Sequence, residues 1–171
     1  MNYFLAADEI ATMAADLELK GAALYDHIGA VVADDTVKRI VAWLAEQERQ
    51  HEKDFRSIAE AHRTLDATQE YSVDVRGMLG TAMRSLEEVL SGKRPIEKDL
   101  STVGSCLQVA AHVEALSVST YDAMRGTFGS RFTGVLARLV EEEQRHQDVI
   151  LKVQRRLGLP ASAVRRLHAF A

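Results

Sequence analysis

Hydrophobic residues recur along this chain at intervals of three and four positions, the spacing that places them on one face of a helix. One such stripe spans residues 5–32, and a second spans residues 37–58. The polar cluster at 34–36 separates them and supplies a helix N-cap. Because the link is so short, the two predicted helices must lie antiparallel as a hairpin.

The same pattern returns in the second half of the chain. It predicts a third helix over 100–128 and, after Gly129 and Ser130, a fourth over 132–157 that ends at Gly158 and Pro160. The stretch 64–102 reads as a crossover along the bundle that carries an amphipathic helix at 74–90, so that helices two and three run parallel. We expect one all-α domain over 1–171, with a short C-terminal extension at 159–171.

Composition agrees with the all-α class and excludes several functions. The chain has 171 residues, 47% of them hydrophobic, and only two prolines. A net charge of −4 with mixed signs gives no basic surface for nucleic acid, and no apolar run is long enough for a membrane span. The single cysteine, Cys106, excludes an internal disulfide and a four-thiolate metal site and is expected to be a small buried hydrophobe. Nothing resembles a signal peptide, so a cytoplasmic location is expected.

Ionisable residues interrupt the hydrophobic stripes at regular places. Two Glu-x-x-His segments each put a carboxylate and an imidazole on one helix face, and each is preceded by a glutamate in the previous helical stripe. The six residues are Glu18, Glu48, His51, Glu114, Glu143 and His146.

The two halves of the chain also correspond to each other. Residues 44–51 read Leu-Ala-Glu-Gln-Glu-Arg-Gln-His and residues 139–146 read Leu-Val-Glu-Glu-Glu-Gln-Arg-His, while Glu18 and Tyr25 correspond to Glu114 and Tyr121. We interpret this as a repeated helical hairpin. Two such hairpins about a pseudo-twofold axis would bring the four glutamates and two histidines to one level of the core.

Four buried carboxylates repel one another and lose their hydration, and two histidines cannot neutralise them all. Two divalent cations can, and carboxylate oxygens with one imidazole per ion suit iron or manganese. The alternative is that the six residues are polar groups satisfied within the protein or solvated helix faces. Their position in hydrophobic stripes favours the metal site.

With these motifs, the chain resembles the ferritin-like di-iron carboxylate proteins, and most closely their rubrerythrin-related branch. The resemblance implies a ferritin-like four-helix bundle and two iron ions per chain, for which manganese or zinc could substitute in a crystal. It also implies that Glu18 and Glu143 are terminal ligands, that Glu48 and Glu114 are bridging ligands, and that His51 and His146 each serve one iron.

The sequence departs from that family in three places. Rubrerythrins have a second domain with four cysteines that passes electrons to the iron, so this chain, with one cysteine, needs a separate electron donor protein. They also have an additional glutamate where this chain has Ser117. Bacterioferritins have a haem-binding methionine where this chain has Arg49, so a haem-bearing cage is not expected.

The function implied by the resemblance is an oxidoreductase in which Fe(II) pairs react with hydrogen peroxide or dioxygen, as a peroxidase or ferroxidase. The alternative is an iron-binding or iron-storage protein without a dedicated redox substrate, and a third possibility is a helical interaction module without turnover. The stripe over 75–90 either covers a flank of its own bundle or pairs with another subunit; we expect a homodimer.

Tyr25 and Tyr121 are candidates for an active-site role, because each lies two turns beyond a ligand glutamate. Each could bond a ligand carboxylate or donate an electron, or be an ordinary core tyrosine. The remaining histidines are expected at the surface or its boundary: His27, His62, His112 and His168. Four further glutamates lie off the inward stripes and are expected to be solvated: Glu46, Glu52, Glu141 and Glu142.

Overall fold

The structure is a computed structural model that describes residues 7–63, 77, 79–81, 84, 100, 102–127 and 130–159. These residues form helices and no strand, as the predicted all-α class requires. The long helices are α1 (Ala7–Val31), α2 (Asp35–Arg63), α4 (Val103–Thr127) and α5 (Ser130–Arg156). Apart from a few single residues, the predicted crossover at 64–102 with its helix at 74–90, and the extension at 159–171, lie outside the described residues.

The helix ends have the chemistry that the sequence predicts. The carboxylate of Asp34 accepts hydrogen bonds from the backbone N–H groups of Thr36 and Val37, both 2.9 Å long, and so caps α2. Thr102 caps α4 in the same way by accepting from the backbone N–H of Ser105, so this helix begins at Val103 and not at the predicted residue 100. After α5, Gly158 adopts a positive φ of 67°, and the N–H of Leu159 reaches the carbonyl of Gln154, which closes the helix in a Schellman motif.

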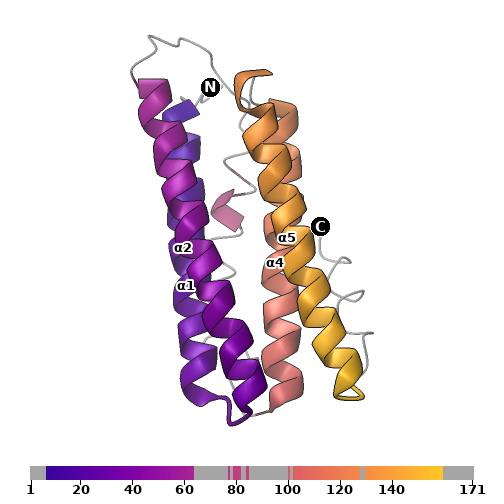
Figure 1. Cartoon of the computed structure of the whole chain (residues 1–171). Helices are drawn as coiled ribbons and strands as arrows, with labels where there is room; N and C mark the ends of the chain where they lie inside the picture. The colour runs from indigo at the N-terminus through magenta and orange to yellow at the C-terminus, as the bar shows by residue number, and fades with distance from the viewer. Residues whose placement is uncertain are drawn as a thin grey trace.

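The four helices lie side by side as two hairpins (Figure 1), with α1 packed along α2 and α4 packed along α5. Contacts between the hairpins give their relative direction. Glu48 on α2 lies near Glu114 on α4. Two turns further along both helices, Phe55 packs on Tyr121, so α2 and α4 run parallel. Contacts between α2 and α5 proceed in opposite directions along the two helices, which makes that pair antiparallel.

The inward stripes predicted from the sequence form the core. In each helix the residues at the predicted inward positions are buried or half-buried wherever they are described, with one exception. Leu157 was expected to face inward, but it is 44% exposed because the chain turns away there, directly after α5. Cys106 is buried as expected, and its thiol donates a hydrogen bond to the carbonyl of Leu100. Leu79, the one described member of the 75–90 stripe, is buried within the single chain.

Within the described part of the chain, no helix combines the length and the hydrophobicity that a membrane crossing requires. The charged outer faces of α2 and α5 account for this, because both helices alternate an apolar stripe with ion-paired surface residues. Examples are the pairs of Arg56 with Asp16 and of Arg138 with Asp54.

Replacement of the α2 cap, Asp34→Ala, is expected to lower the free energy of unfolding by about 1 kcal/mol, because two helix N–H groups lose their acceptor. The neighbouring Asp35→Ala is a matched control, since it removes a charge from the same helix end whose described contact is a 4.0 Å surface ion pair with Lys38 and not a capping hydrogen bond. Urea unfolding followed by circular dichroism measures both. Equal losses in the two variants would contradict the assignment of the cap.

Candidate metal centre

The six predicted ligand residues come together at one level of the bundle, and all six are buried. Glu18 comes from α1, Glu48 and His51 from α2, Glu114 from α4, and Glu143 and His146 from α5. None of their side chains is more than 3% exposed. The inward stripe of each helix thus delivers its ionisable residues to the interface between the two hairpins.

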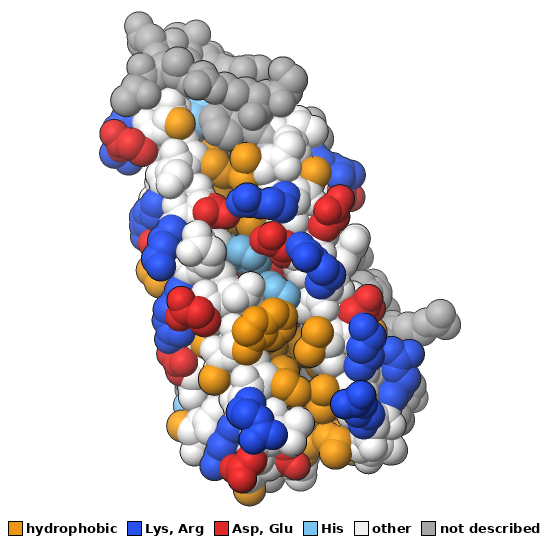
Figure 2. All heavy atoms as spheres, in the orientation of Figure 1, with side chains coloured by type: hydrophobic (Ala, Val, Ile, Leu, Met, Phe, Trp, Pro, Cys, Tyr) orange, Lys and Arg blue, Asp and Glu red, His pale blue; other side chains and the backbone are white. Residues whose placement is uncertain are grey.

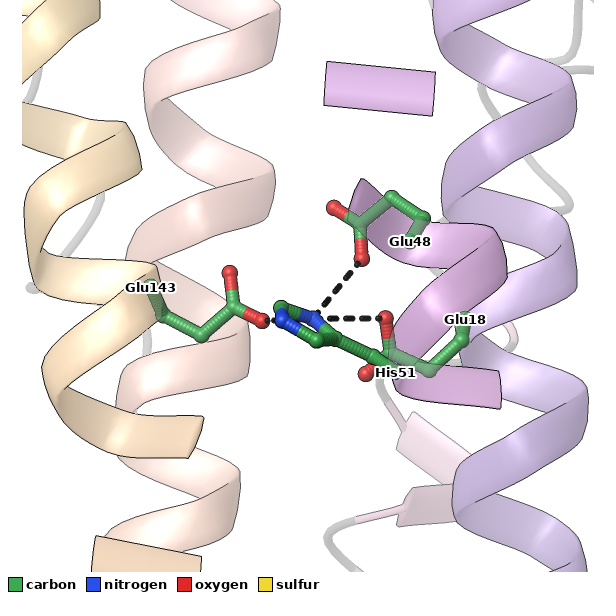
Figure 3. A group of neighbouring side chains, drawn as sticks. All are labelled: Glu18, Glu48, His51 and Glu143. Carbon is green, nitrogen blue, oxygen red and sulfur yellow. Dashed lines mark ion pairs between the residues drawn. The ribbon is translucent and has the colours of Figure 1, made fainter. Parts of the chain in front are cut away.

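The first group surrounds the ring of His51, as Figure 3 shows. Its Nδ1 lies 2.8 Å from Oε1 of Glu143 and 3.7 Å from Oε2 of both Glu18 and Glu48. One oxygen or nitrogen from each of these four residues lies within 4.8 Å of the others. Carboxylates from three helices therefore converge on one imidazole nitrogen.

The second group surrounds His146. Its Nδ1 lies 3.3 Å from Oε2 of Glu143 and 3.4 Å from Oε2 of Glu114, and Glu48 completes the set. The rings of His51 and His146 stack with centroids 5.5 Å apart and planes inclined by 16°. Each group of three carboxylates and one imidazole could hold a metal ion, and the two groups are adjacent.

The resemblance implies that Glu48 and Glu114 are the bridging ligands, and that assignment stays a prediction. In the structure, Glu48 and Glu143 belong to both groups, whereas Glu18 and Glu114 each belong to one. Both shared glutamates come from the helices that carry the Glu-x-x-His segments, α2 and α5. The histidines of these two helices stack against each other.

The donor set fits cations, because its polar atoms have no other partner. Both oxygens of Glu18 and Glu143, one oxygen each of Glu48 and Glu114, and Nδ1 of both histidines are buried without a hydrogen bond in the described structure. Within the same residues, the four carboxylates pair with imidazoles and with no lysine or arginine. Buried polar atoms are normally satisfied, so a whole cluster of them points to a bound ion.

The electrostatics of the cluster without metal are dominated by burial. Burial and the adjacent Glu48 raise the pKa of Glu18 well above its ordinary value, and burial with the adjacent Glu143 does the same to Glu114. Burial alone would lower the pKa of His51, but the carboxylates of Glu143, Glu18 and Glu48 outweigh it and raise that pKa. Burial opposes ionisation of Glu143 as well, yet the two imidazoles hold its pKa below the ordinary range.

The two tyrosines differ in their surroundings. The hydroxyl of Tyr25 donates a hydrogen bond to Oε1 of Glu114, and burial beside that carboxylate raises the pKa of Tyr25. Tyr25 therefore touches a ligand residue. The hydroxyl of Tyr121 is buried without a partner among the described residues, and its ring packs on Phe55 with centroids 5.0 Å apart. Tyr121 is placed as a core tyrosine.

One residue of the site was missed in the sequence. Glu142 was expected to be solvated, but its side chain is 29% exposed and Oε2 lies 3.2 Å from Nε2 of His51. The sequence signal was weak, because the position next to Glu143 falls off the inward stripe. Glu52 was also expected to be solvated, but its side chain is 19% exposed and pairs with Arg56 at 2.9 Å. The remaining expectations agree with the structure: Glu46 and Glu141 are exposed, His27 is exposed, and His62 and His112 are half-buried. His168 lies outside the described residues.

The site lies close to the molecular surface. Figure 2 shows histidine side chains in the seam between α2 and α5, with hydrophobic side chains on one side and charged ones on the other. The indole of Trp43 is 41% exposed and meets the ring of His146 edge-on, with centroids 5.0 Å apart.

Comparison of the chain with protein-family models, with curated proteins and with solved structures gave no match. The site itself is therefore the basis for any functional argument.

The metal-free protein is expected to lose stability as the pH rises from about 5 to about 9. Groups with a raised pKa in the folded state, here Glu18, Glu114 and His51, stabilise the fold fully below their ordinary pKa and lose that contribution as the pH rises. The lowered pKa of Glu143 acts the opposite way, but its contribution is already complete above about pH 5.

Thermal unfolding of chelator-treated protein across this range measures the effect. The neutral variant Glu18→Gln is expected to show a shallower decline, because one of the buried carboxyl groups no longer titrates. A melting temperature that rises toward alkaline pH in the metal-free protein would contradict the charge distribution described above.

Proposed function

We propose that this chain is a ferritin-like di-iron protein of the rubrerythrin type, which binds two iron ions and reacts them with hydrogen peroxide or dioxygen. The observation that carries the proposal is the pair of adjacent buried groups, each with three carboxylates and one imidazole, whose inward-facing atoms lack other partners. Hard oxygen donors with one imidazole per ion suit Fe(II) and Mn(II). The parallel course of α2 and α4 agrees with a ferritin-like bundle.

Two ferrous ions would supply the two electrons that convert one peroxide molecule, with two protons, into two waters. The chain's own residues provide the setting for this. Glu48 and Glu143, which belong to both groups, and Glu18 and Glu114, which belong to one each, would hold the two ions. Tyr25 orients Glu114 through its hydrogen bond. The stacked imidazoles close the site toward the surface. Reduction then requires a separate donor, because the chain has a single, buried cysteine.

Metal binding is expected to be stoichiometric at about two ions per chain and to raise the melting temperature. At a free metal concentration one hundred times Kd each bound ion adds about 2.7 kcal/mol, so two ions are expected to raise the melting temperature by roughly 10–20 °C for a chain of this size. Glu143→Ala removes a carboxylate common to both groups and should abolish paired binding. Glu141→Ala, on the exposed face of the same helix, is the matched control. Metal analysis and calorimetry on anaerobic protein check both.

The reaction is tested by loading the metal-free protein with Fe(II) under anaerobic conditions and adding peroxide or dioxygen separately. We expect near-ultraviolet absorbance of ferric iron to develop faster with peroxide than with dioxygen. Iron storage is the competing function. It would appear as continued uptake beyond two ions per chain into a hollow many-subunit shell, which light scattering detects. Failure to bind iron at all would reject both.

A further inference from the structure

We propose that the two metal positions are unequal, with the tighter one at His51, and that Glu142 is the positioning residue that makes it so. This inference rests on the proposed function, because it concerns the same site. The sequence repeat gives the two halves of the site equivalent ligand residues. The inference follows from differences between the surroundings of these ligands.

The first difference is the support behind each histidine. Oε2 of Glu142 lies 3.2 Å from Nε2 of His51. A carboxylate can only accept a hydrogen bond, so Nε2 donates to Glu142, and in the metal-bound form Nδ1, which faces the cluster, would be the ligand nitrogen. Arg145 and Arg138 lie 3.5 Å and 4.0 Å from the other oxygen of Glu142. No carboxylate partner for Nε2 of His146 is found among the described residues, and that ring meets the indole of Trp43 instead.

The second difference is the state of the terminal carboxylates. Both oxygens of Glu18, in the His51 group, are free of hydrogen bonds within the described structure. In the His146 group, Oε1 of Glu114 accepts the hydrogen bond of Tyr25, which leaves only Oε2 for an ion. Tyr121 is the counterpart of Tyr25 in the repeat, yet its hydroxyl makes no such bond. The His51 position therefore has more free anionic oxygens.

The repeat identifies the residues responsible. Position 142 corresponds to Gln47, and position 138 corresponds to Trp43. A glutamate and an arginine on the His51 side thus stand where the His146 side has a neutral amide and an indole. The ligands match across the repeat, whereas the residues beside them do not. The charge of Glu142 favours a cation at His51, whereas the opposite charge of Arg138 is paired with Asp54 and Glu142.

A functional consequence follows for the proposed chemistry. Two-electron reduction needs both ions, so the weaker position at His146, beside the exposed Trp43, decides whether the site is competent. The protein would hold one ion at low metal concentration and become active as the second binds.

The test measures the two stepwise dissociation constants for Co(II), by competition with a chromophoric chelator, on the full chain. In the unmodified protein the first constant is expected to be at least about tenfold smaller than the second. Glu142→Gln should weaken the first step by about 10- to 100-fold, the usual effect of losing the partner of a ligand histidine. Glu141→Gln removes the same charge from the neighbouring exposed position and should change neither step beyond about twofold.

Two further variants assign the steps to positions. His51→Ala should remove the tight step, whereas His146→Ala should retain one ion with nearly unchanged affinity. Circular dichroism verifies that each variant is folded. Loss of the tight step in His146→Ala, or equal effects of Glu142→Gln and Glu141→Gln, would overturn the inference while leaving metal binding intact. Absence of any Co(II) binding in the unmodified protein would instead reject the proposed function itself.

Discussion

The burial of four carboxylates at one level of a helical bundle is the constraint on which this structure depends. Each carboxylate loses its hydration, and no lysine or arginine in the described chain compensates it. Without metal, the protein can lower the electrostatic cost of burial only by keeping some of these carboxyl groups protonated. The raised pKa of Glu18 and Glu114, beside the raised pKa of His51, has this physical cause. A divalent cation displaces those protons and satisfies the same oxygens.

The position of the cluster gives this electrostatic balance a structural role. α1 packs intimately on α2 and α4 on α5, while contacts between the two hairpins are sparser. The carboxylates and imidazoles lie in that sparser interface, with contributions from both hairpins to each group. Repulsion within the cluster therefore acts against association of the halves, and bound cations would act for it. Stability of the assembled bundle and occupancy of the site are in this way expected to be coupled.

Helical periodicity was sufficient to predict the four long helices, their buried faces and all six residues of the cluster, because each of these follows from spacing along one helix. Contacts of particular side chains between helices did not follow from periodicity. Glu142 is adjacent to a ligand on α5 but supports the histidine of α2, which no pattern within α5 reveals. The presence of Glu143 in both groups could have been anticipated, since the repeat pairs it with Glu48, which also belongs to both. Tertiary packing also determines that the hydroxyl of Tyr25 bonds to Glu114, whereas that of Tyr121 has no such partner among the described residues.

The geometry of a helix explains how a repeated hairpin can hold matched ligands in unmatched surroundings. The residues that face the cluster match across the repeat, Glu48 with Glu143 and His51 with His146. A neighbouring residue in the helix is rotated by about 100°, so it lies at the rim and reaches only the outer nitrogen of one histidine. Substitution there changes the support of a single ion without altering the ligand set. The rim, represented by Glu142 against Gln47, is therefore the place where the two positions can be adjusted separately.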